Sequence, residues 1–135
     1  WDSLCNWVSD ATHLCVRTGR TSGIFVVDFD AKDNGPQTWH EWPREHDGSF
    51  PDTLRQRTKS GGFHLFYGLP EGVAVGSHNR VTTGTDVKGD GGLVVVAPSP
   101  GYSWWPGSGS VITPFPAVIV SVKPAAWSRK GSRLR

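Results

Sequence analysis

The stretch Ile24-Phe25-Val26-Val27-Asp28-Phe29-Asp30 decides the fold class of this 135-residue chain. Its β-branched and aromatic residues predict a buried β-strand over residues 24–30. Side chains two apart in a strand project from the same face, about 7 Å apart. Asp28 and Asp30 are therefore expected to project together, and a hard divalent cation such as Mg²⁺ or Mn²⁺ is a natural partner for two carboxylates. The alternative is a solvated strand end that caps the following turn.

The flanking sequence predicts a mixed α/β (α+β) domain with more strand than helix. Pro36 is well placed to begin a helix that carries Trp39 and Trp42 and ends near Pro43. The continuous apolar run over residues 93–97 predicts a central strand, buried on both faces. Shorter strands are expected at residues 13–18, 55–58 and 64–67, loops at residues 70–79 and 98–110, and the end of a helix at residues 1–9.

A second motif, Thr58-Lys59-Ser60-Gly61-Gly62-Phe63-His64, combines donors that suit a phosphate group. Paired glycines let backbone N–H groups approach an anion closely. Ser60 adds a hydroxyl, and His64 opens a strand from which its ring could donate to a phosphate oxygen. The GxxxxGK[ST] spacing of a Walker loop is absent. The alternative is an ordinary hairpin turn followed by an unrelated histidine.

A third motif, Gly84-Thr85-Asp86-Val87-Lys88-Gly89-Asp90-Gly91-Gly92, precedes the apolar run. Asp86 and Lys88 are expected to share one face of a strand, whereas Asp90 is expected to form the turn. The alternative is a surface hairpin with a salt bridge.

Charge and composition exclude several classes of protein. The last nine residues hold four cations, which leaves ten cations and twelve acidic residues in residues 1–126. The body of the chain is therefore not basic, and any contact with nucleic acid has to be local or depend on bound cations. No apolar stretch approaches the roughly 20 residues needed to span a bilayer. The two cysteines fit a reducing compartment.

In this order, the three motifs resemble the primase-polymerase (prim-pol) domain of the archaeo-eukaryotic primase superfamily, of the bifunctional DNA primase/polymerase N-terminal type. The resemblance covers about residues 12–105 and is most specific over residues 86–99, where Asp86-Val87-Lys88 leads through the glycine turn to Ala97-Pro98-Ser99. It implies an RRM-like mixed β-sheet catalytic core. The chain contains no methionine, and we expect it to be truncated at its N-terminus relative to the family.

The resemblance also assigns roles to residues. It implies that Asp28, Asp30 and Asp86 are catalytic and hold Mg²⁺ or Mn²⁺. It implies that the nucleotide is bound by five residues: Ser60, Gly61, Gly62, His64 and Lys88.

By resemblance the chain is a metal-dependent nucleotidyltransferase, a DNA primase and DNA polymerase that uses a two-metal carboxylate site. The implied partners are a DNA template and primer, nucleoside triphosphates and a helicase domain or protein C-terminal to this chain, with no membrane. The implied location is the cytoplasm of a bacterial host, for a phage- or plasmid-encoded replication protein. We expect residues 1–110 to form a partial catalytic domain and residues 111–135 a divergent segment with a basic tail.

Two other classes remain open. One is a catalytically inactive RRM-like module that binds single-stranded nucleic acid or nucleotides through exposed aromatic residues. Its candidates are Phe29, Phe66, Trp104 and Trp105. The other is a metal-dependent nuclease or strand transferase of the replication-initiator kind, which needs a His-x-His pair that this sequence lacks.

Overall fold

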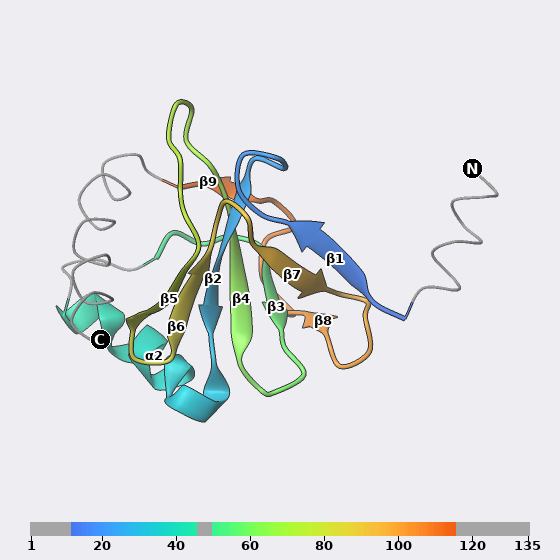
Figure 1. The fold of residues 1–135 in the computed structure, drawn as a ribbon. Coiled ribbons are helices and arrows are strands. Elements are labelled where there is room, and N and C mark those ends of the chain that lie inside the picture. Colours follow the sequence, from blue (N-terminus) through green and yellow to red (C-terminus); the bar gives the residue numbers. More distant parts are fainter. Residues whose placement is uncertain (1–11, 46–49, 116–135) are drawn as a thin grey trace.

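The computed structural model describes residues 12–45 and 50–115 (Figure 1). The helix end expected at residues 1–9 and the basic tail lie outside the described residues. Within them, the chain forms a mixed α+β fold of mostly antiparallel strands with one α-helix. This confirms the fold class that the sequence predicts.

The main sheet contains seven strands. Six of them lie in the order β5 (His78–Thr82), β6 (Thr85–Lys88), β2 (Ile24–Phe29), β4 (Phe63–Gly68), β3 (Arg55–Arg57) and β8 (Ser103–Trp104). The seventh, β9 (Thr113–Pro114), pairs in parallel with the end of β4, whereas the six are joined by antiparallel ladders. The short strands predicted on either side of Gly61 are thereby confirmed as β3 and β4.

One helix follows β2 after a short turn of 3-10 helix, η1 (Ala31–Asp33). The helix α2 (Gly35–Glu45) begins beside Pro36 and ends two residues after Pro43, as predicted. The predictions of the helix and of an end near Pro43 are therefore both confirmed.

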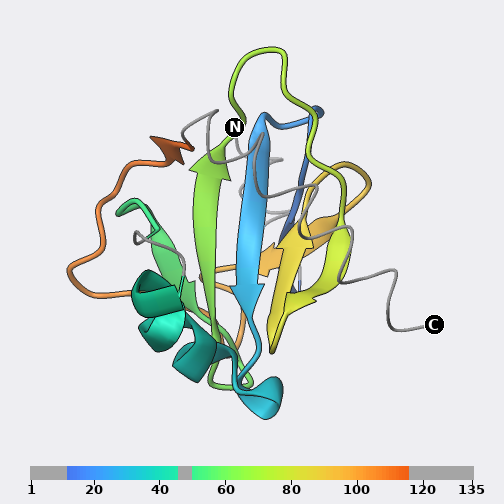
Figure 2. The ribbon, with the colours of Figure 1, turned by 90° about the vertical axis from the view of Figure 1, so that its left-hand side faces the viewer.

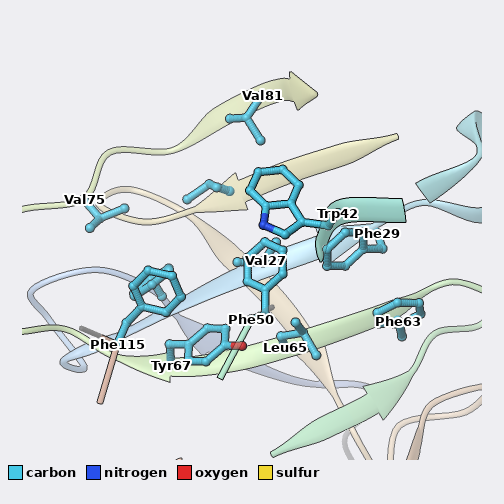
Figure 3. Packing of buried hydrophobic residues seen from close by; sticks show 12 residues of the cluster. Val27, Phe29, Trp42, Phe50, Phe63, Leu65, Tyr67, Val75, Val81 and Phe115 are labelled. Atoms are coloured by element: carbon cyan, nitrogen blue, oxygen red, sulfur yellow. The ribbon is translucent and has the colours of Figure 1, made fainter. Parts of the chain in front are cut away.

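The main hydrophobic core lies between the sheet and α2 (Figures 2 and 3). Alternate residues of β2, namely Phe25, Val27 and Phe29, are at most 1% exposed. Trp42 of the helix and Phe115 pack in the same cluster. Rings stack and meet edge to face throughout it, with Phe29 and Phe63 centroids 4.9 Å apart.

The buried phenol of Tyr67 in this core is satisfied by one hydrogen bond. Its hydroxyl donates to the carbonyl of Pro51 over 2.6 Å. Burial raises the pKa of Tyr67 well above its ordinary value, because the phenolate would lose its hydration. The tyrosine therefore stays protonated and contributes to packing.

The second face of the sheet carries a separate two-stranded ribbon. In it, β1 (Leu14–Arg17) pairs with β7 (Leu93–Val96), and among the described residues neither strand belongs to the seven-stranded sheet. Val94 and Val96 pack against Val26 of β2 and the ring of Phe66. The prediction of a central strand over residues 93–97 was therefore wrong, and Leu93 is 59% exposed. The run is apolar because one side of the ribbon packs face to face on the sheet, and not because β7 is inserted in it.

The strand β1 confirms the short strand predicted near residues 13–18. The strand β5 was not predicted, and its first two residues were assigned to a loop. Its pairing with β6 is irregular, with a register shift between His78 and Thr82. Of the helices within the described residues, none has the length and apolar character to cross a membrane.

Candidate active site

Three of the predicted site residues lie side by side across three adjacent strands. In the ladders of β2, Asp28 is directly opposite His64 of β4 and directly opposite Asp86 of β6. Residues that are paired across strands project from the same face of a sheet. All three side chains therefore lie on the face away from the main core, because their neighbours Val27 and Phe29 point into that core. The family resemblance implied that Asp28 and Asp86 act together, but the sequence could not supply this register.

Each carboxylate of the site has a different partner. Asp28 Oδ1 lies 3.3 Å from Nε2 of His64, and Asp86 Oδ2 lies 3.1 Å from Nζ of Lys88. The side chain of Asp28 is 24% exposed and that of Asp86 is 30% exposed, whereas the His64 side chain is 8% exposed. The two carboxylates are thus accessible from solvent, while the imidazole is held against the sheet.

Asp30 lies beyond the end of β2 and has a local role in this structure. Its side chain caps η1 by accepting a hydrogen bond from the backbone N–H of Lys32 over 2.9 Å. This matches the capping alternative for the Asp-Phe-Asp motif. Across residues 12–45 and 50–115, no three His, Cys, Asp or Glu side chains lie close enough to form a metal-binding group. The convergence of Asp30 with the other two acids stays a prediction.

The glycine loop between β3 and β4 is a tight turn that packs against the end of β2. Gly61, with a φ of +89°, donates its N–H to the carbonyl of Thr58, so that this amide is engaged within the turn. A Cβ on Gly62 would lie 2.1 Å from the carbonyl oxygen of Phe29. Gly62 is therefore a close-approach glycine that lets the loop reach the site end of β2. Ser60 is exposed, with its hydroxyl 3.3 Å from that of Thr58.

The glycine turn after β6 holds the two sheets together. The hydroxyl of Thr18 donates to the carbonyl of Gly89 over 2.6 Å, and the N–H of Thr18 donates to Gly92. Asp90 accepts from the backbone N–H and the side chain of Arg20, at 2.7 and 3.0 Å. Asp90 is thus a turn residue, as predicted, and it also anchors the loop that precedes β2.

Gln56 of β3 is a member of the site that the sequence did not indicate. It is opposite His64 in the β3–β4 ladder and is 0% exposed. Its side-chain nitrogen lies 2.9 Å from Nδ1 of His64. A glutamine between two arginines in a three-residue strand carries no local signal, and only the register of the sheet reveals its neighbour.

The aromatic residues proposed to bind single-stranded nucleic acid fall into two groups: two are buried and two are at least partly exposed. Phe29 and Phe66 are buried, at 0% and 3% exposure, and are therefore excluded as stacking platforms. Trp104 is 45% exposed, and it is opposite Gln56 in the β3–β8 ladder, on the face that carries Asp28. Trp105 lies on the other face, where its ring contacts Phe63 and lies 4.6 Å beneath the guanidinium of Arg57.

A comparison with known protein families identifies the family of the chain. The profile of the Prim-Pol family, described as "Bifunctional DNA primase/polymerase, N-terminal", matches residues 1–118. The chain belongs to this family, and this confirms the resemblance seen in its motifs. A DNA primase/polymerase-type role and general nucleotidyltransferase activity follow from the membership. No curated protein matches the chain.

Proposed function

We propose that this chain is the catalytic core of a template-directed DNA primase/polymerase, in which Asp28 and Asp86, with Asp30, hold one or two divalent cations beside a nucleoside triphosphate. One observation carries the proposal. Asp28 stands between its cross-strand partners Asp86 and His64 on the face of the sheet opposite the main core.

The donor set fits a hard cation such as Mg²⁺ or Mn²⁺. Like charges directly opposite one another in a sheet destabilise it, unless a positive group lies between or beside them. Here the ammonium group of Lys88 compensates the carboxylate of Asp86, and Nε2 of His64 lies 3.3 Å from the carboxylate of Asp28. Carboxylate oxygens are the ligands that Mg²⁺ prefers, and phosphate oxygens and water can complete its shell. Such a cation would neutralise charge on the triphosphate and activate the attacking hydroxyl.

The protein groups would then bind and orient the nucleotide. Phosphoryl transfer depends chiefly on positioning and charge neutralisation, so few side chains have to enter the chemistry. His64 would donate from Nε2 to a phosphate oxygen, and Lys88 would add positive charge near Asp86. Ser60 and the Gly62 region of the loop would lie along the triphosphate. In the conformation described, the Gly61 amide is engaged in the turn, so its role is to shape the loop.

The proposal includes an RRM-like core for the fold, and a DNA template, a primer and a helicase as partners. The antiparallel strands β6, β2, β4 and β3, covered on one face by α2, are compatible with an RRM-like core. The implied DNA template, primer and helicase partner follow from the family resemblance. The domain boundary at residue 110 stays a prediction, and β9 and Phe115, which lie beyond it, pack with the main sheet.

The second candidate is an inactive module that binds nucleic acid or nucleotides. The exposed ring of Trp104 favours it, because bases stack readily on exposed aromatic side chains. In this candidate, nucleotide or single-strand binding persists in EDTA and no primer is extended. In the polymerase, productive nucleotide binding and extension both require the cation.

Primer extension by charge-neutral variants tests the proposal. Asp28→Asn and Asp86→Asn are each expected to reduce Mg²⁺- or Mn²⁺-dependent extension at least about 1,000-fold, which corresponds to roughly 4 kcal/mol in the barrier. Asp33→Asn is the matched control, since Asp33 is an exposed acid in the turn after β2, and it should retain wild-type extension. Full activity of both site variants would refute the assignment.

A further inference from the structure

We propose that Gln56 is a positioning residue that fixes the ring orientation and the protonated nitrogen of His64, so that Nε2 carries the hydrogen that faces Asp28 and, on the proposed function, the nucleotide phosphate. No motif of the sequence indicates this role. The inference rests on the proposed function only in its last step, the delivery of the hydrogen to phosphate.

The orientation of the Gln56 amide follows from its two backbone partners. Oε1 accepts a hydrogen bond from the N–H of Ala97 over 2.9 Å, and Nε2 donates to the carbonyl of Val95 over 2.7 Å. A backbone N–H can only donate and a carbonyl can only accept. The reversed amide would place oxygen against oxygen and nitrogen against N–H. These contacts therefore assign the amide without reference to His64.

The second hydrogen of the amide then determines the histidine. Nε2 of Gln56 lies 2.9 Å from Nδ1 of His64. An amide nitrogen only donates, so Nδ1 has to accept and carries no hydrogen. In an imidazole with one hydrogen, the hydrogen bond at one ring nitrogen decides which nitrogen is protonated. The hydrogen is therefore on Nε2, which lies 3.3 Å from Oδ1 of Asp28.

The surroundings keep this chain of contacts in place. Gln56 is 0% exposed and the His64 side chain is 8% exposed, so water does not compete readily for either. The ring of His64 also lies edge to face with Phe66, with centroids 6.2 Å apart. The amide is supported from β7 and the ring from β4. Gln56 thereby connects the two-stranded ribbon to the site.

The first test needs no variant. A long-range ¹H–¹⁵N correlation spectrum of the histidine side chains distinguishes protonated from unprotonated ring nitrogens. Recorded on the 135-residue chain in mildly alkaline buffer without metal or nucleotide, it should show His64 protonated at Nε2 alone. A hydrogen on Nδ1 instead would overturn the inference.

The second test separates positioning from a merely structural role. Gln56→Met keeps the length of the side chain and removes its hydrogen bonds; we expect a mixture of the two His64 tautomers and about tenfold weaker binding of dATP with Mg²⁺ by calorimetry. Thr53→Val is the matched control. Thr53 is also buried, and its hydroxyl donates to the carbonyl of Phe66 and accepts from the N–H of Thr113.

Thr53→Val should lower the melting temperature but leave the His64 spectrum and the dATP affinity unchanged. A folded Gln56→Met that matches Thr53→Val in both readouts would overturn the inference. If Gln56→Met does not fold, the spectrum of the unmodified chain decides. Full extension by Asp28→Asn and Asp86→Asn would remove the proposed function, whereas the wild-type tautomer of His64 would stand independently of it.

Discussion

The two faces of β2 carry side chains of different kinds: one face packs into the hydrophobic core and the other carries a charged residue of the candidate site. The two kinds alternate along the same strand. Phe25, Val27 and Phe29 point into the core and are at most 1% exposed. Asp28 points to the other face, where it has lost part of its hydration but retains 24% exposure. The alternation places a charged site one residue from the most buried part of the fold. Stability and chemistry should therefore respond to different substitutions.

The largest expected effect on stability is on the core face. Phe29→Ala removes a ring that packs against Phe63 and Trp39, and large-to-small changes of this kind cost about 3–5 kcal/mol. That is a large part of the 5–15 kcal/mol typical of a whole domain. Chemical denaturation of the 135-residue chain would measure it as a lower midpoint at an unchanged slope.

Asp28→Asn is the matched change one residue away. It keeps the shape of the side chain and removes the repulsion with Asp86, so we expect its unfolding free energy to lie within about 1 kcal/mol of the unmodified chain. A loss from Asp28→Asn as large as that from Phe29→Ala would break the comparison between the two faces.

A further prediction concerns nucleic-acid binding by the exposed tryptophan beside the site. Trp104→Ala should weaken binding of a single-stranded oligonucleotide by about 5- to 150-fold, which corresponds to roughly 1–3 kcal/mol for one stacked base. Its effect on stability should be small, because the ring is 45% exposed. Fluorescence anisotropy with a labelled oligonucleotide measures the affinity, and an unchanged affinity would remove Trp104 from the nucleic-acid surface.

Local sequence rules predicted the strands and the helix better than they predicted which strands pair with one another. The β-branched and aromatic residues of residues 24–30 identified β2, and Pro36 marked the beginning of α2. The apolar run at residues 93–97 misled the prediction, because a strand buried between two others and a strand packed face to face on a sheet both need apolar side chains. The two cases are distinguished by strand pairing: in the structure Val94 and Val96 pair with residues of β1 and not with a strand of the main sheet.

The site shows the same limit. Alternation along a strand placed Asp86 and Lys88 on one face, and their contact confirms it. The opposition of Asp28 to Asp86 and to His64 depends on register between strands far apart in sequence. Gln56 had no local signal, since its importance comes from β4 on one side and β7 on the other. Asp30 caps η1 by accepting a hydrogen bond from the N–H of Lys32. The Asp-Phe-Asp motif alone does not distinguish such a cap from a metal ligand.

On the function proposed above, Asp28 and Asp86 form a cation site on the face of the sheet opposite the main core. Paramagnetic broadening by Mn²⁺ locates such a site directly in the ¹H–¹⁵N spectrum of the 135-residue chain. Titration with Mn²⁺ in the presence of dATP should first broaden the backbone amides of Asp28, His64 and Asp86, and Asp86→Asn should abolish the broadening at low Mn²⁺. Broadening centred elsewhere, such as at Asp52, or unaffected by Asp86→Asn, would contradict the account.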